Sequence, residues 1–179
     1  MKPNGTVDLE KLGWVDILLL LKSRGLDTHL VPRAIARLGK PLDADRMATA
    51  KDVVAGYLSD SEALVRHEAM WFLGSWGRFR EFAPQFESIL AHDPDGDNRC
   101  YAAICLGRLF EGTKDSRITE LLADWVRRGD QPEQVRLTCY AGLLLVQRGA
   151  EGRSTSDAFY LGDNALGDVD WTWVQTLGQ

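Results

Sequence analysis

Residues 65–74 read VRHEAMWFLG, and two later stretches repeat their pattern. Residues 98–107 read NRCYAAICLG, and residues 135–144 read VRLTCYAGLL. In each stretch an Arg is followed three residues later by a small residue and seven residues later by a Leu. These spacings place side chains on one face of a helix. The pattern therefore predicts three equivalent helices, each with a buried face made by its small residue and its Leu.

An Asp lies six residues before each of these Arg residues, and a fourth Asp and Arg pair occurs earlier in the chain. In that first unit Lys40 replaces the Leu. Successive units are offset by 33, 33 and 37 residues, a length typical of two-helix repeats. The pairs are Asp27 and Arg33, Asp60 and Arg66, Asp93 and Arg99, and Asp130 and Arg136.

These eight residues are expected to form a structural ladder. An Asp at a helix start accepts backbone N–H bonds, and an Arg binds the Asp of its own or a neighbouring unit in a fork. The alternative is that the four Arg residues bind an anionic ligand. It is less favoured, because each Arg has an Asp in its own repeat and a partly buried Arg is normally paired.

Apolar spacing typical of helices also occurs between the repeated stretches, at residues 9–22, 44–58, 83–92 and 118–128. Gly and Pro residues separate these segments from their neighbours. Each unit is therefore expected to be a helical hairpin, which buries its apolar face by stacking on the next hairpin. The sequence predicts an all-α fold with about four hairpins in residues 1–149 and a C-terminal capping segment in residues 150–179.

This pattern resembles the HEAT repeat, and more closely the short HEAT-like repeats of phycobilisome-lyase-type proteins. That family has an Asp in the turn, then Val-Arg, an Ala one turn later, and Leu-Gly. One unit matches throughout, and the next has Asn98 in place of Val; the matching residues are Asp60, Val65, Arg66, Ala69, Leu73 and Gly74. The resemblance covers roughly residues 8–148 and implies an α-solenoid, an armadillo/HEAT-like superhelix whose second helices line the concave side. It supplies no catalytic residue.

The composition is that of an ordinary globular protein with an acidic balance. The net charge is -5, so non-specific binding to nucleic acid or to an anionic membrane has no electrostatic support. The longest apolar run, residues 17–21, is too short to span a bilayer. The N-terminus lacks the pattern of a secretory signal, and Cys100, Cys105 and Cys139 lie in apolar stretches. These features favour a cytoplasmic protein with reduced, buried thiols.

Motifs for common chemistry are not found in the sequence. There is no phosphate loop, zinc-binding HExxH helix, CxxC pair or nucleophile elbow. Residues 92–98 place carboxylates at alternate positions like a calcium loop, but Asn98 and Ile104 occupy the places of its Gly and bidentate Glu. His67 and Glu68 are adjacent, so their side chains diverge on a helix. We therefore expect neither an enzyme nor a metal or cofactor site.

A soft, uncharged stripe is expected on the second helices. The positions one and four residues after each Arg lie near one another on a helix face, and large residues occupy or flank them. Such stripes are common in protein-binding surfaces, although the alternative is that these groups belong to the core. The stripe residues predicted to bind a partner are His67, Met70, Trp71 and Tyr140.

The segment 150–179 differs in composition from the repeats. It carries a net charge of -4 together with four large aromatic residues. In residues 168–174 polar and apolar residues alternate, as they do along a strand or an extended arm. The segment is either an end cap for the array or a docking surface for a basic protein, and the two roles are compatible. Its candidate binding residues are Asp168, Asp170, Trp171 and Trp173.

The leading hypothesis is a non-enzymatic protein-protein interaction module. A sharper version, suggested by size and charge, is an inhibitor or immunity-type protein that binds a basic effector. The alternative, drawn from the resemblance, is a bilin lyase or chaperone-like HEAT protein. A HEAT-like DNA glycosylase is disfavoured, because it needs a cationic groove. The oligomeric state and the partner's identity stay open.

Overall fold

The structure is a computed structural model, and it describes residues 7–40, 43–162 and 164–177. Over these residues the chain is helical and contains no β-strand, which confirms the expected all-α class. The internal contacts divide the chain into two compact units, with the boundary in the sequence between Gly77 and Arg78. The boundary expected after residue 149 falls inside the second unit. Within the described ranges, no helix has both the length and the apolar character required to cross a membrane.

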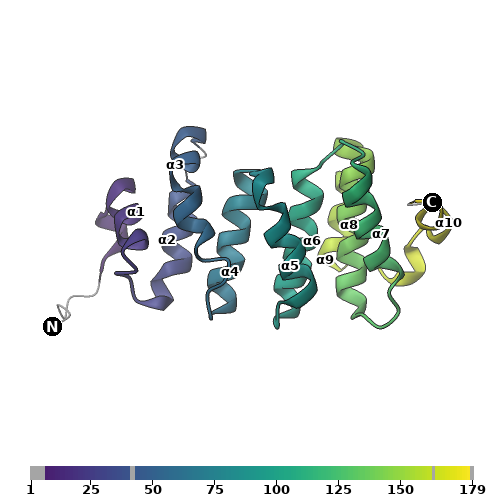
Figure 1. The fold of residues 1–179 in the computed structure, drawn as a ribbon, viewed down its shortest axis with the longest axis horizontal. Coiled ribbons are helices and arrows are strands. Elements are labelled where there is room, and N and C mark those ends of the chain that lie inside the picture. The colour runs from purple at the N-terminus through teal and green to yellow at the C-terminus, as the bar shows by residue number, and fades with distance from the viewer. Residues whose placement is uncertain (1–6, 41–42, 163, 178–179) are drawn as a thin grey trace. The chain divides into compact units, whose positions relative to one another are not determined.

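The first unit contains two helical pairs (Figure 1). Helix α1 packs on α2 and α3, and α2 packs on α4. Their bounds are α1 Trp14–Lys22, α2 Val31–Leu38, α3 Ala44–Ala55 and α4 Ala63–Met70. The core of this unit includes Ile17, Leu21, Ile35, Leu38, Val54 and Phe72, each at most 2% exposed.

Helix α4 continues directly into a π-helical segment, Trp71–Trp76. The wider turn ends where the Gly77 amide donates to the Phe72 carbonyl at 2.9 Å. A Cβ at Gly39 would lie 2.4 Å from the ring of Trp76. Gly39 thus allows the indole to pack against the end of α2, which any larger residue would prevent.

The second unit is built around α8. Helix α5 packs on α6, and α8 contacts α6, α7 and α9; Figure 1 shows α7 and α8 side by side in green. The bounds are α5 Ala83–His92, α6 Gly96–Leu109, α7 Ser116–Arg127, α8 Glu133–Arg148, α9 Arg153–Leu161 and α10 Trp171–Thr176. The repeat positions predicted to be buried in this unit are within the core, with Ala102, Leu106, Cys139 and Leu143 all 0% exposed.

Helices α6 and α8 touch through their backbones. A Cβ on Gly107 would lie 2.6 Å from the Cα of Gly142, and a Cβ on Gly142 would lie 2.7 Å from the carbonyl oxygen of Ala103. Both distances are shorter than an ordinary contact of about 3.5–4.0 Å. Gly107 and Gly142 therefore allow this close backbone approach, which a side chain at either position would prevent.

The C-terminal segment corrects the expectation of a strand or extended arm. Residues Leu166–Asp168 form a 3-10 turn, and α10 follows it. The Asp168 carboxylate accepts from the Ala165 amide at 2.8 Å, and the Asp170 carboxylate accepts from the Trp173 amide at 2.9 Å. An Asp at a helix start stabilises the first turn in this way. These cap bonds stabilise helical turns in a stretch whose alternating acidic and apolar residues are typical of a strand.

The described residues of segment 150–177 pack within the second unit. Phe159 and Val174 are buried, and Arg127 of α7 donates to the carbonyls of Val174 and Leu177. The Asp170 amide donates to the Tyr140 hydroxyl at 3.3 Å. The described part of this segment therefore contributes core residues to the unit that it follows.

Candidate functional site

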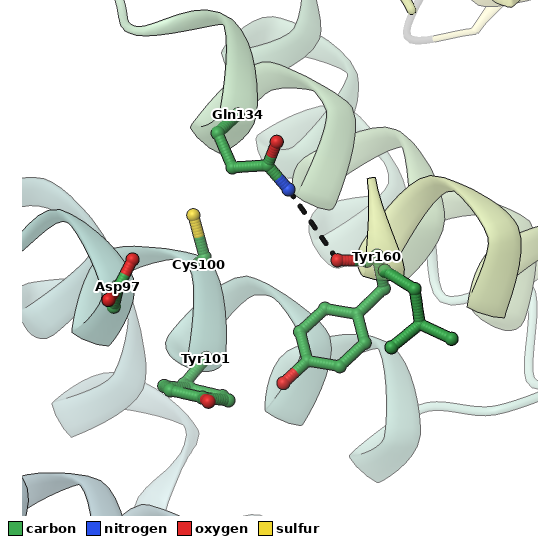
Figure 2. Close-up of a pocket in the computed structure, with 6 residues that line it drawn as sticks. Asp97, Cys100, Tyr101, Gln134 and Tyr160 are labelled. Atoms are coloured by element: carbon green, nitrogen blue, oxygen red, sulfur yellow. Dashed lines mark hydrogen bonds between the residues drawn. The ribbon is translucent and has the colours of Figure 1, made fainter. Parts of the chain in front are cut away.

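A pocket of about 270 Å³ lies between α6, α8 and α9. Figure 2 shows its side chains arranged around a shared space, with the Cys100 sulfur and the Tyr160 ring on opposite sides of it. The lining residues are Asp97, Cys100 and Tyr101 from α6, Gln134 from α8, and Tyr160 and Leu161 from α9.

Helix geometry explains how these side chains meet. Asp97 and Tyr101 are four residues apart and so share one face of α6. Gln134 lies in the first turn of α8, and its Nε2 approaches the Tyr160 carbonyl at 3.5 Å. The rings of Tyr101 and Tyr160 have centroids 6.0 Å apart and planes inclined at 60°. Two tyrosine rings thus form one wall of the pocket.

The ionisable groups of the wall are mostly neutral. Burial raises the pKa of the Tyr160 phenol, and a hydrogen bond with Tyr101 raises it further, while the charge of Arg108 opposes the shift. Burial also raises the pKa of the Cys100 thiol. A phenol and a thiol with raised pKa values are poor bases and nucleophiles at neutral pH. The arrangement therefore suits binding, with Asp97 supplying a negative charge at the exposed edge.

A second hollow, of about 400 Å³, lies beside α1 in the first unit. Its lining includes Trp14, Arg37, Lys40 and Arg46. Arg37 binds Glu10 at 2.7 Å, and Arg46 lies 3.7 Å from Asp43. These cations are partly neutralised by their own neighbours, so the pocket of the second unit is the better candidate site.

Three of the four Arg residues of the structural ladder bind backbone carbonyl oxygens. Arg99 donates from Nε to the Leu90 carbonyl at 2.9 Å, and Arg136 donates from Nε to the Val126 carbonyl at 2.9 Å. Helix α6 thus binds the last turn of α5, and α8 binds the last turn of α7. Arg66, which is 7% exposed, donates to the carbonyls of Asp60 and Ser61 at 2.8 and 3.0 Å.

This geometry corrects the expected fork between Arg and Asp for Arg99 and Arg136. The last carbonyls of a helix have no partner within the helix, so a nearby guanidinium satisfies them. Arg99 also reaches the Gln131 side chain and lies over the Trp125 ring. In the first unit Arg33 binds the Glu10 carboxylate rather than Asp27.

The Asp residues of the ladder are not the acceptors that cap α2, α4, α6 and α8. Asp60 and Asp93 each accept the amide two residues later, from Glu62 and Asp95, within the turns that precede α4 and α6. The cap of α6 is Asp95, which accepts from the Asn98 amide at 2.9 Å. Asp27 precedes a 3-10 turn without a side-chain cap bond, and Asp130 accepts from the Gln131 side chain.

Two of the predicted stripe residues are in the core. Met70 is 0% exposed and Tyr140 is 3% exposed, so neither presents a surface to a partner. The equivalent positions Ala103 and Leu137 are also buried, at 0% and 2% exposure. His67 and Trp71 are half-buried and lie edge to face, with ring centroids 6.1 Å apart.

The candidate residues near the C-terminus lie at the surface of the second unit. Asp168 and Asp170 are exposed, although each carboxylate also caps a turn. Trp171 and Trp173 are half-buried, and the guanidinium groups of Arg136 and Arg148 lie 5.5 and 5.0 Å from their ring centroids. These aromatic rings are thus partly committed to intramolecular contacts.

The pocket residues were not among the sequence candidates. The four-residue spacing of Asp97 and Tyr101 on a predicted helix is a signal that could have identified the side of the pocket formed by α6. Tyr160 and Leu161 could not be placed, because α9 was not predicted. Within the described ranges no group of three or more His, Cys, Asp or Glu side chains could hold a metal ion.

Comparisons with protein-family models, with curated proteins and with solved structures give no match. The functional assignment therefore depends on the chain's own residues and their geometry.

Proposed function

We propose that this protein is a non-enzymatic protein-binding module built as a short α-solenoid of HEAT-like hairpins. The contact of an Arg with a carbonyl in the last turn of the preceding helix occurs in both α6 and α8, which supports a repeated hairpin. Repeated hairpins stack through their apolar faces and present long surfaces to partners.

The observation that carries the binding role is the pocket between α6, α8 and α9, with an exposed Leu beside it. Leu161 is 70% exposed, and it adjoins the half-buried rings of Tyr101 and Tyr160. Tyrosine is enriched in protein interfaces, where an aromatic body and a polar hydroxyl are both used. The neutral thiol and phenol of the pocket favour recognition over chemical transformation.

The partner is proposed to be a basic protein. Residues 150–179 carry a net charge of -4 out of the chain's -5, and Asp157, Asp168 and Asp170 of this segment are exposed. A concentrated negative charge speeds the encounter with a cationic partner and disfavours acidic ones. An inhibitor or immunity-type protein that neutralises a basic effector is the sharper form of this proposal.

Site-specific photo-crosslinking in the native cell tests the proposal. A benzoylphenylalanine replaces Leu161 in one variant and Leu64, which is 61% exposed in the first unit, in a control variant. We expect a discrete adduct from position 161, weakened by added salt and by combined Asp168→Lys and Asp170→Lys substitution. Equal or absent adducts at the two positions would contradict the proposed surface.

A further inference from the structure

We propose that the pocket between α6, α8 and α9 receives one cationic side chain, a Lys or an Arg, of the partner protein. This inference rests on the proposed function and specifies the chemistry of the same surface. Four features of the pocket carry it: its charge, its aromatic wall, its amide and its size.

The charge at the pocket is negative. Asp97 is exposed in the first turn of α6, and it is the charged residue among those that line the pocket. Arg99, two residues after Asp97, donates to the Leu90 carbonyl and to the Gln131 side chain and is not part of the pocket lining.

The aromatic wall suits a cation. The ring centroids of Tyr101 and Tyr160 are 6.0 Å apart and the planes are inclined at 60°, so the two rings offer faces in different directions. A cation within about 6 Å of a tyrosine ring is attracted by the negative face of the ring. In Figure 2 Asp97 and Tyr160 lie on different sides of the pocket, so a cation between them meets a carboxylate and a ring.

The amide of Gln134 adds an acceptor. Its Nε2 is directed to the Tyr160 carbonyl at 3.5 Å, which assigns the other amide atom as the carbonyl oxygen. A carbonyl oxygen accepts a hydrogen bond from an ammonium or guanidinium group but offers nothing to a carboxylate. The Gln134 carbonyl and the Asp97 carboxylate are therefore both acceptors for a cationic donor.

The size of the pocket limits the occupant. Its volume of about 270 Å³ lies below the range of about 300–1,000 Å³ found for drug-sized ligands. One long side chain fits that space, and the exposed Leu161 at its edge offers apolar contact to the residues that flank the cation.

Tyrosine NMR provides the test. The chain has only four Tyr residues, so a protein with ¹³C-labelled tyrosine rings gives a spectrum that Tyr101→Phe and Tyr160→Phe variants assign. The probes are N-acetyl-arginine amide and N-acetyl-lysine amide, with neutral N-acetyl-citrulline amide as the control. We expect saturable shifts of the Tyr101 and Tyr160 signals with either cation and binding at least about five-fold weaker with citrulline.

Matched charge variants make the result specific. Asp97→Asn should weaken cation binding about five-fold, whereas Glu120→Gln, an exposed acid on α7, should leave it unchanged. Unaltered Tyr57 and Tyr140 signals in Asp97→Asn establish that the variant is folded. Equal shifts with citrulline, or full cation binding by Asp97→Asn, would overturn the inference.

The crosslinking experiment separates this inference from the proposed function. Adduct formation at position 161 that is lost in Asp97→Asn supports both. An adduct that Asp97→Asn leaves unchanged overturns the cation pocket and keeps protein binding. Cation shifts without any adduct overturn protein binding, and with it the assignment of the occupant to a partner protein.

Discussion

Substitution of Gly107 by Ala should destabilise the protein through the contact between α6 and α8. The new methyl group would lie 2.6 Å from the Gly142 Cα and 2.8 Å from the Gly142 carbonyl oxygen. An ordinary carbon contact is about 3.5–4.0 Å, so the helices would separate by about 1 Å. Both close atoms belong to the backbone, and no side-chain rotation relieves them.

The magnitude follows from two opposing effects. A gap of about 1 Å forfeits up to about half of the dispersion energy across a contact, and overpacking a core costs about 1–3 kcal/mol. The rigid backbone contact places this site at the upper end of that range. The higher helix propensity of Ala relative to Gly stabilises the helix by about 1 kcal/mol and offsets part of this cost. The net loss is therefore about 2 kcal/mol, or a decrease of about 4–8 °C in Tm for a chain of this length.

Urea unfolding followed by far-ultraviolet circular dichroism measures this loss. The matched control is Gly96→Ala at the first position of the same helix, where no heavy atom lies within 4 Å of the added methyl group. We expect the control to stay within about 0.5 kcal/mol of the parent or to be more stable. The reasoning fails if Gly107→Ala is as stable as Gly96→Ala.

Three further substitutions test the packing and charge of the second unit. Leu106→Ala empties a fully buried position and should cost about 2–5 kcal/mol in urea unfolding. Arg136→Gln removes the bond to the Val126 carbonyl and should cost about 1–3 kcal/mol, whereas no loss would refute a structural role. The Glu111 pKa is lowered chiefly by hydrogen bonding to Arg153, so Glu111 stabilises the fold above its unfolded pKa of about 4.5. That contribution disappears as pH falls through the lower folded value, and Glu111→Gln, compared by urea midpoints from pH 7 to pH 3, should remove this part of the pH dependence.

The helices of the hairpins could be predicted because their signal is local. The segment expected at residues 83–92 is α5, and the segment expected at residues 118–128 is α7 to within two residues at its start. Helix α9 was missed because its first turns are polar and show little apolar periodicity. The alternation of residues 168–174 predicts an extended segment where the structure has α10, because alternation does not reveal that Asp170 caps a helix.

The ladder and the pocket could be predicted only in part, because both depend on non-local contacts. Spacing identifies an Arg at each equivalent position, but only the folded hairpin reveals that Arg99 and Arg136 bind carbonyls. Likewise, periodicity identifies the helix face of Tyr140 but not the neighbours that bury it. The pocket needs Tyr160 of α9 beside Tyr101 of α6, and 59 residues of sequence separate them.

The distribution of cysteine and tryptophan makes the stability of each unit measurable without any label. Cys105 and Cys139 belong to the second unit and are 1% and 0% exposed. Their alkylation by a thiol reagent in native buffer therefore reports how often that unit opens. The six tryptophans divide equally, with Trp14, Trp71 and Trp76 in the first unit and Trp125, Trp171 and Trp173 in the second. Fluorescence that changes before the thiols react would show that the first unit opens independently.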